Sequence, residues 1–246
     1  MLAFRRRGST WLCGAIAGSC GKGYRLQCDI EKYFARVDHS VLMERLSRKV
    51  GDLRMLRLLQ SLLAHGAEGP SRGMPIGNLT SQLFANVYLD ALDHFAKEEL
   101  RVRHYLRYMD DFLLLAGDRR EARTLLAEVK EFLREQLRLK LNRRRIVLAP
   151  LCEPCDFLGY VQFGDERTRV RRRSVRRLWR RLPALAQGLA SGRVSYAQAR
   201  CCISSWFGLA KHADALQLSR AIFSVRDVAN IGKRLLVREM SFATRP

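Results

Sequence analysis

Two adjacent carboxylates, Asp110 and Asp111, stand between two apolar runs within residues 105–116. The flanking side chains favour β-strands, so the pair is expected at the turn of a β-hairpin. Neighbouring aspartates repel each other and lose hydration when strands pack around them, and a bound cation would offset both penalties. A polar hairpin tip without a metal explains the same pair. The segment therefore predicts a hairpin, and a metal site if other parts of the chain supply further ligands.

A third carboxylate, Asp29, stands at the end of residues 24–30, which have the pattern of a strand. If that strand pairs with the hairpin in one antiparallel sheet, Asp29 and Asp110 come together despite their separation in sequence. Mg²⁺ takes octahedral oxygen ligands and usually one or two protein carboxylates. Two such ions can activate a hydroxyl and neutralise a leaving pyrophosphate. The spacing therefore fits nucleotidyl transfer, with Asp111 supporting the site or binding the second ion transiently.

The charge balance points to a polyanionic partner. The chain has 246 residues, 45 Lys and Arg against 24 Asp and Glu, and a net charge of +21. Residues 167–213 contain eleven Arg and one Lys but no acidic residue. A solvated helix face would explain some of these charges, but such faces usually alternate in sign. The pattern favours a surface that follows nucleic-acid phosphates.

Hydrophobic periodicity predicts an α+β chain whose last part is helical. Pro183 is expected to interrupt one of the late helices, and Trp206 and Phe207 have the spacing of core residues. Thr80 or Ser81 is expected to cap a long helix that runs to about Leu100. The other elements are helices from Val41 to Val50 and over 52–64, 120–138, 174–190 and 195–210, and strands over 139–149 and 156–163.

The cysteines and the N-terminus favour a cytoplasmic protein. Seven cysteines with no paired framework fit a reducing compartment without disulfides. Cys152 and Cys155 have the spacing of half a zinc site, but no second half follows, so a turn near Pro154 is expected. The basic start is superficially similar to an export signal, but its apolar run is short and broken by glycines. No stretch reaches the length of a membrane-spanning helix, and no membrane partner is expected.

These segments resemble the motifs of reverse transcriptases, in the order in which that family has them. Tyr108–Asp111 is similar to motif C, Asp29 with Phe34 to motif A, and Gly73–Gln82 to motif B. The resemblance covers about residues 4–223. Further similarities are Phe4–Ser9 to the fingers motif 2, Leu139–Asn142 with Arg143–Arg145 to motif D, and Asp156–Tyr160 to the primer-grip motif E.

The resemblance implies a right-hand polymerase palm, with an antiparallel sheet, packed helices and partial fingers over residues 1–163. A basic helical thumb and tail would occupy 164–246. The implied enzyme is an RNA-directed DNA polymerase, a nucleotidyltransferase that adds dNTPs to a primer 3′-hydroxyl along a template RNA. Two Mg²⁺ ions, or Mn²⁺ in their place, would be its cofactors.

Site residues are carried over by position. Asp29, Asp110 and Asp111 would be the catalytic carboxylates and, with Ile30, the metal site. Phe34 would be a steric gate against the ribose 2′-hydroxyl, whereas without the resemblance an ordinary core aromatic is the preferred explanation. The implied nucleotide-binding residues are Phe34, Ile30, Ile76, Gly77, Asn78, Gln82, Arg5, Arg6 and Arg7. The implied nucleic-acid contacts are Tyr108, Met109, Lys140, Arg171, Arg172, Arg173, Arg176 and Arg177.

The sequence of motif B points to one subgroup of reverse transcriptases. Group II intron enzymes typically carry Gln-Gly-x-x-x-Ser-Pro, whereas Ile76–Gln82 is similar to the enzymes of diversity-generating retroelements. Ser205–Ala213 also resembles their compact thumb. That subtype copies a template-repeat RNA into mutagenised cDNA with a small basic accessory protein. A group II intron or retron enzyme is the alternative.

Two features depart from the family pattern. The chain starts at motif 2, so the upstream fingers with motif 1 are expected to be missing, and Arg145 stands where the family often has Lys. A truncated, non-catalytic nucleic-acid-binding protein is therefore a second interpretation. Basic surface alone suffices for phosphate binding, so the presence of all three carboxylates with Phe34 favours the enzyme.

Overall fold

The computed structural model describes residues 23–64, 71–75, 77–165 and 167–223. The described residues form two compact units, 23–151 and 152–223. The three short strands after residue 152 belong to the second unit, since they pair with one another and Tyr160 donates a hydrogen bond to the Leu209 carbonyl. The palm–thumb boundary predicted after residue 163 stays a prediction, and the compact units divide twelve residues earlier.

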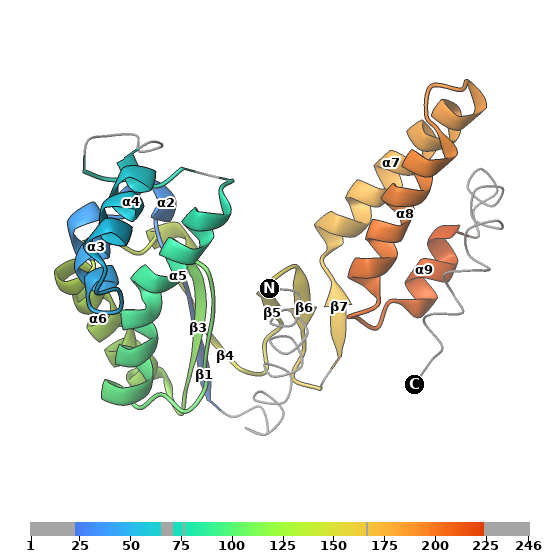
Figure 1. The fold of residues 1–246 in the computed structure, drawn as a ribbon. Coiled ribbons are helices and arrows are strands. Elements are labelled where there is room, and N and C mark those ends of the chain that lie inside the picture. Colours follow the sequence, from blue (N-terminus) through green and yellow to red (C-terminus); the bar gives the residue numbers. More distant parts are fainter. Residues whose placement is uncertain (1–22, 65–70, 76, 166, 224–246) are drawn as a thin grey trace. The chain divides into compact units, whose positions relative to one another are not determined.

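The first unit is built on a four-stranded antiparallel sheet with the strand order β2-β3-β1-β4. Figure 1 labels β1, β3 and β4 of this sheet. The predicted strand at 24–30 and the predicted hairpin are both present. The strand structure predicted over 139–149 is confirmed only from Val147 onward, because the Asn142 side chain accepts a hydrogen bond from the Arg144 N–H and starts a 3₁₀ turn, Arg143–Arg145. The strands are β1 (Tyr24–Asp29), β2 (Tyr105–Tyr108), β3 (Asp111–Ala116) and β4 (Val147–Pro150).

Helices pack against one face of this sheet (Figure 1). Alternation along β1 turns Leu26 and Cys28 into the core, where they join Phe112 and Leu114 of β3. The opposite face therefore carries Arg25, Gln27 and Asp29. The helices of this unit are α2 (Tyr33–Arg36), α3 (His39–Ser47), α4 (Leu53–Ala64), α5 (Leu79–His94), which continues as a π-helical turn (Phe95–Glu99), and α6 (Arg119–Gln136).

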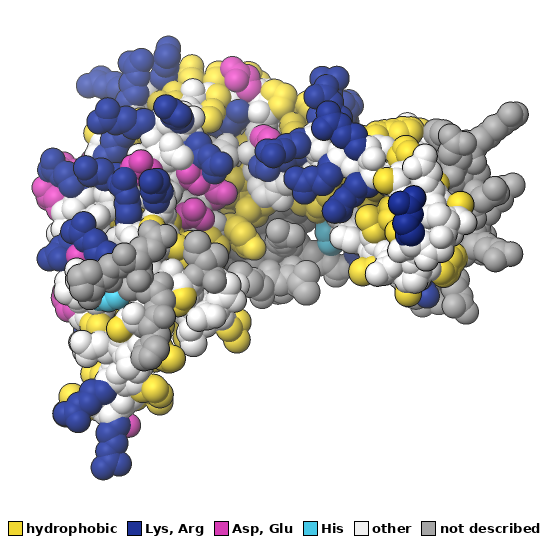
Figure 2. Space-filling view, turned by 90° about the horizontal axis from the view of Figure 1, so that it is seen from above, with side chains coloured by type: hydrophobic (Ala, Val, Ile, Leu, Met, Phe, Trp, Pro, Cys, Tyr) yellow, Lys and Arg dark blue, Asp and Glu magenta, His cyan; other side chains and the backbone are white. Residues whose placement is uncertain are grey.

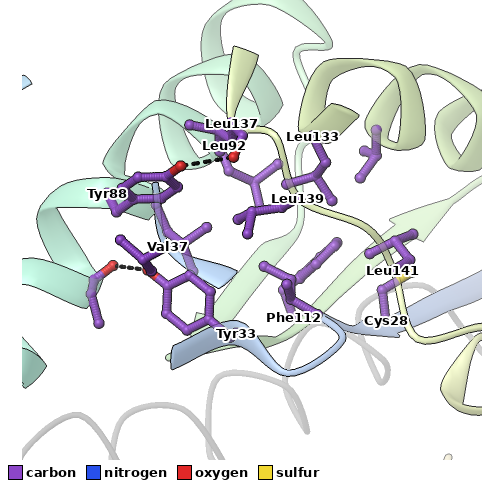
Figure 3. Close-up of a cluster of buried hydrophobic side chains, with 14 of the residues drawn as sticks. Cys28, Tyr33, Val37, Tyr88, Leu92, Phe112, Leu133, Leu137, Leu139 and Leu141 are labelled. Atoms are coloured by element: carbon purple, nitrogen blue, oxygen red, sulfur yellow. Dashed lines mark hydrogen bonds between the residues drawn. The ribbon is translucent and has the colours of Figure 1, made fainter. Parts of the chain in front are cut away.

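Two buried tyrosines tie α5 into this core (Figure 3). The Tyr33 hydroxyl donates to the Ala85 carbonyl at 2.6 Å, and the Tyr88 hydroxyl donates to the Leu137 carbonyl at 2.8 Å. Both phenols thereby satisfy polar atoms that burial would otherwise penalise. The predicted cap of α5 is wrong by a few residues: Asn78 is the N-cap, and Ser81 is buried within the first turn.

The second unit combines a three-stranded antiparallel sheet with three helices. The strand structure predicted over 156–163 is present as a hairpin of two strands, because Leu158 and Gly159 have φ of 52° and 95° and form a two-residue turn. Strand β7 and helix α9 were not predicted. The elements are β5 (Cys155–Phe157), β6 (Tyr160–Gln162), β7 (Thr168–Val170), α7 (Arg172–Ala190), α8 (Tyr196–Ala210) and α9 (Leu216–Phe223).

Helix α7 runs without a break through Pro183, contrary to the prediction. Its residues on both sides of the proline, Leu178, Leu182 and Gly188, are buried, and α7 packs along α8. This packing offsets the missing backbone hydrogen bond at the proline. The core role predicted for Trp206 is confirmed, since Trp206 is buried with Ile203 in the core of this unit.

Candidate active site

The register of the sheet brings two distant carboxylates together. Asp29 of β1 is the direct cross-strand partner of Asp111 of β3. Directly opposed residues of an antiparallel pair project from the same face with their Cβ atoms about 5 Å apart. Asp29 is only 7% exposed. Without a counter-ion, two carboxylates in these positions repel each other.

Asp110 occupies the turn of the hairpin beside this pair. Tyr108 pairs with Asp111, so Met109 and Asp110 form a two-residue loop, and Met109 has a left-handed φ of 58°. The Ile30 N–H donates to the Asp110 carbonyl at 3.2 Å and fixes the turn against the end of β1. The three predicted catalytic carboxylates therefore lie at one end of the sheet.

Asp29 has two donors from the segment after α6. Asn142 Nδ2 donates to one carboxylate oxygen at 3.0 Å, and Arg145 Nη1 donates to the other at 3.2 Å. The Asn142 backbone N–H also donates to the Asp29 carbonyl at 2.8 Å. Asn142 and Arg145 were not among the predicted site residues. Their similarity to motif D was the available signal, but it did not reveal which carboxylate they contact.

Burial and mutual repulsion perturb the other two carboxylates. Burial, followed by the charges of Asp29 and Asp110, raises the pKa of Asp111 to about 6. Burial also raises the pKa of Asp110, with Asp29 adding to the rise and Arg145 opposing it. Perturbed carboxylates that converge at one place are typical of sites that bind cations or transfer protons.

The donor set fits a hard cation. Carboxylate oxygens are the ligands that Mg²⁺ prefers, and the Arg145 guanidinium already occupies a cation's place against Asp29. Among the residues that the structure describes, no three or more His, Cys, Asp or Glu side chains are arranged to enclose an ion. Mg²⁺ sites in proteins usually have one or two carboxylate ligands, with substrate phosphates and water completing the shell.

Replacing Asp111 by Asn should stabilise the metal-free protein at alkaline pH. The raised pKa means that the folded state binds a proton on Asp111 more tightly than the unfolded state does. The free energy of unfolding of the wild type therefore falls as the pH rises through about 6. The neutral amide removes the repulsion. At pH 8 with a chelator present, we expect the thermal unfolding midpoint of the variant to be a few degrees above that of the wild type, which corresponds to about 1 kcal/mol in the free energy of unfolding. Below about pH 4 we expect no difference. Thermal melts at both pH values measure it, and an unchanged midpoint at pH 8 would contradict it.

Replacing Arg145 by Gln should strengthen cation binding at the carboxylates. The guanidinium competes with a metal for Asp29, but it is largely exposed, so the ion pair is worth about 1 kcal/mol or less. We expect Mn²⁺ to bind severalfold more tightly, as read by electron paramagnetic resonance. Arg144→Gln in the same 3₁₀ turn is the matched control. Weaker Mn²⁺ binding in the Arg145 variant would show that Arg145 supports the metal site instead of competing for it.

Phe34 lies in α2 on the segment after Asp29. It is half-buried, with its ring against the edge of the Tyr33 ring at a centroid distance of 5.5 Å. Its carbonyl accepts the Met74 N–H at 2.8 Å, which joins the motif A segment to the motif B loop. The side chain thus retains exposed area that the fully buried Tyr33 lacks, and its role as a gate stays a prediction.

The other predicted nucleotide residues fall into three groups. Gly77 has φ of +100°, and Asn78 and Gln82 lie at the start of α5, where both retain exposed area. The side chain of Ile30 is buried in the core, so only its backbone is left to contact a ligand. Ile76, Arg5, Arg6 and Arg7 lie outside the described residues.

The predicted nucleic-acid contacts lie in both units. In the first, Tyr108 and Met109 flank the carboxylates and are half-buried, while Lys140 is exposed. In the second, Arg171 forms an ion pair with Asp156 and precedes α7. The remaining four are exposed on α7: Arg172, Arg173, Arg176 and Arg177.

The sequence matches a known family model over residues 3–162, described as reverse transcriptase (RNA-dependent DNA polymerase). The chain belongs to the reverse transcriptase family. Among curated relatives, it is 24% identical to protein YkfC of Escherichia coli K12, over 60% of this chain and 48% of YkfC. It is 21% identical to the group II intron-encoded protein LtrA of Lactococcus lactis subsp. cremoris, over 57% of this chain and 35% of LtrA. The reverse transcriptase chain thus spans less than half of each of these relatives.

Solved structures confirm the fold. Apo telomerase from Candida tropicalis has a TM-score of 0.57 at 11% identity, covering 99% of this chain and 46% of the telomerase. Telomerase from Candida albicans, in complex with a fragment of telomeric RNA, has a TM-score of 0.55 at 13% identity. The match covers 98% of this chain and 48% of the telomerase. At these identities the similarity concerns the fold alone, and it confirms the predicted α+β palm of a reverse transcriptase.

Proposed function

We propose that this chain is an RNA-directed DNA polymerase that adds dNTPs to a primer 3′-hydroxyl. The register that sets Asp29 opposite Asp111, with Asp110 in the adjoining turn, carries the proposal. Asp29 and Asp110 would hold two Mg²⁺ ions, which supply charge neutralisation and an acidified 3′-hydroxyl when bound. The primer 3′-hydroxyl would lose its proton to water, and its oxygen would bond to the α-phosphorus of the dNTP as the bond to the leaving pyrophosphate breaks.

The residues of this chain would place the reactants. The half-buried Phe34 would lie against the sugar of the incoming nucleotide, and the start of α5, with Asn78 and Gln82, would contact the base pair being formed. Asp111 would assist at the metal site, because a bound cation would offset the burial and the carboxylate repulsion that raise its pKa. These roles agree with the half-exposed positions of Phe34 and Gln82.

Helix α7 would follow the phosphates of the template–primer duplex. Arg172, Arg176 and Arg180 recur at helical spacing, as do Arg173, Arg177 and Arg181. Arg177 and Arg181 also line a hollow of about 460 Å³ together with Tyr160, a residue of the primer-grip segment. Dark-blue Lys and Arg side chains gather in clusters on the face that Figure 2 shows. This distribution suits backbone contact without base recognition.

Replacing Arg172, Arg173 and Arg176 together by Gln should weaken nucleic-acid binding and its dependence on salt. Each phosphate contact contributes about 0.9 to the slope of log affinity against log salt on duplex. We expect the slope to fall by about two to three, as measured by fluorescence anisotropy with an RNA–DNA duplex. The triple variant of exposed α6 residues, Arg119, Arg120 and Arg123, is the control with equal charge. Equal slopes in both variants would contradict a specific role for α7.

Template-directed incorporation tests the proposed function. A DNA primer annealed to RNA is supplied with Mg²⁺ and one dNTP at a time, at low salt so that phosphate contacts are not screened. The proposal predicts addition of the dNTP that is complementary to the RNA base. RNA binding without incorporation of any dNTP would instead identify a non-catalytic nucleic-acid-binding protein.

We further propose the diversity-generating subtype, in which a template-repeat RNA is copied with frequent errors at adenine and a small basic accessory protein takes part. The sequences of Ile76–Gln82 and Ser205–Ala213 support this subtype. Ile76 replaces a side chain able to hydrogen-bond near the nucleotide. Changing Ile76→Gln should lower misincorporation at template adenines, as counted by sequencing the cDNA. An unchanged error rate would leave a group II intron or retron enzyme as the better proposal.

A cytoplasmic location is proposed from the cysteines. Cys28, Cys152, Cys155, Cys201 and Cys202, which the structure describes, form no disulfide. The described helices include none long and apolar enough to cross a membrane.

A further inference from the structure

An ion pair between a buried arginine and a half-buried aspartate joins the hairpin to helix α5. Arg107 of β2 donates its Nε–H to Asp93 Oδ1 at 2.6 Å and a second N–H to Asp93 Oδ2. The Arg107 side chain is only 9% exposed, and the Asp93 side chain is 34% exposed. The Tyr105 hydroxyl donates to the same Asp93 oxygen at 2.7 Å. The bidentate geometry fixes both the distance and the angle between β2 and α5 at this point.

The remaining arm of Arg107 reaches the turn that carries Asp110. Arg107 Nη1 donates to the Met109 carbonyl at 3.1 Å, and Asn86 Oδ1 of α5 lies 3.4 Å from the same nitrogen. Met109 immediately precedes Asp110 and holds a left-handed backbone conformation. The orientation of the Met109 peptide directs the chain into Asp110. One planar guanidinium therefore connects α5 to the turn of the candidate active site.

Stability alone is a weak explanation for this pair. The buried guanidinium and the half-buried carboxylate both lose hydration, and well-packed apolar residues of similar volume are often at least as stabilising. A buried fork does impose geometry, since its donors lie in one plane and each meets a separate acceptor. Here the acceptors are a carboxylate on α5 and a carbonyl in the turn.

We propose that Arg107 and Asp93 are positioning residues that set the placement of Asp110 relative to α5. This inference rests on the proposed function, in which Asp110 binds the metal and the start of α5 contacts the incoming base pair. The Arg107–Asp93 pair fixes the position of the metal site relative to the nucleotide site. The turn carries the first site and α5 carries the second, and Arg107 joins the turn to α5. Lysine preserves the charge but lacks the planar fork that reaches both Asp93 and Met109.

The test compares Arg107→Lys and Asp93→Asn with the wild type in single-nucleotide addition. A small displacement of a catalytic group costs up to about a hundredfold in rate. We expect kcat to fall 10- to 100-fold, the Mg²⁺ concentration for half-maximal rate to rise severalfold, and the KM for the dNTP to change less than about threefold. The double variant should lose little more than either single variant, since both break one unit.

Tyr105→Phe is the matched control, because it removes one hydrogen bond to Asp93 and leaves the contacts of Arg107 with Asp93 and Met109 in place. We expect a change of less than about threefold. Circular dichroism confirms that each variant is folded at the assay temperature, and Mn²⁺ affinity from electron paramagnetic resonance is read in parallel. Folded variants with wild-type kcat, Mg²⁺ dependence and Mn²⁺ affinity would overturn the positioning role.

The failure of this inference is distinguishable from failure of the proposed function. If the wild type extends the primer and the Arg107 and Asp93 variants match it, the positioning role alone fails. If the wild type does not extend the primer, the proposed function fails, and Mn²⁺ affinity still decides the positioning role: weaker binding in both variants supports it, and unchanged binding overturns it.

Discussion

The Asp29→Asn variant should lose at least about a thousandfold in the rate of nucleotide addition. A bound metal ion stabilises the charge of the transition state by several kcal/mol. A neutral amide at position 29 would bind the ion poorly, so most of this stabilisation would be lost. The substitution is nearly isosteric, and an amide oxygen still accepts a hydrogen bond from Asn142 or Arg145. Single-turnover extension with preannealed primer measures the chemical step without a contribution from product release.

Asp90→Asn provides the matched control for this loss. Asp90 is an exposed residue of α5 that faces His94 and has no place in the candidate site. Its substitution changes the net charge by the same amount and should leave the rate unchanged. A rate above one tenth of the wild-type value in Asp29→Asn would show that Asp29 is not a metal ligand.

The Phe34→Ala variant should accept ribonucleotides. If the half-buried ring lies against the sugar, its removal opens the space that a 2′-hydroxyl needs. A pocket that excludes one hydroxyl by shape discriminates by about a hundredfold, so the preference for dNTPs over rNTPs should fall by about that factor. The ratio of kcat/KM for dATP and ATP on one template measures it.

Phe34→Leu and Phe112→Leu separate the gate from the core in that experiment. Leucine at position 34 keeps part of the bulk and should give an intermediate preference. Phe112 is fully buried in the core, so its substitution should lower stability without changing sugar preference. If Phe34→Ala were destabilised and kept its full preference for dNTPs, Phe34 would be an ordinary core aromatic.

Local sequence patterns were sufficient for the parts of the fold that position the carboxylates. The apolar runs around Asp110 and before Asp29 predicted a hairpin and a strand, and their antiparallel pairing followed from the need to bring the carboxylates together. The structure adds the register, which makes Asp111 the direct partner of Asp29. Alternation alone does not determine which residues face each other across two strands that are distant in sequence.

Long-range contacts and an overlooked glycine account for the differences between the sequence-based predictions and the structure. Asn142 and Arg145 reach Asp29 across more than a hundred residues, which no local pattern reports. The turn at Gly159 was overlooked inside an apolar run, although an isolated glycine in a strand pattern is a warning of a break. Pro183 was expected to interrupt α7, but packing of both halves on α8 keeps the helix continuous. In each case tertiary contacts or a single glycine outweighed the local pattern.

The most direct measurement is Mg²⁺-dependent extension of a DNA primer on an RNA template, comparing the wild type with Asp110→Asn, with RNA binding measured on the same samples. Asp110 lies in the turn beside the Asp29–Asp111 pair, and its side chain is not needed for the backbone hydrogen bond from Ile30. We predict extension by the wild type that requires Mg²⁺, none by Asp110→Asn, and equal RNA affinity. Equal extension by both proteins would contradict a metal-dependent polymerase site at these carboxylates.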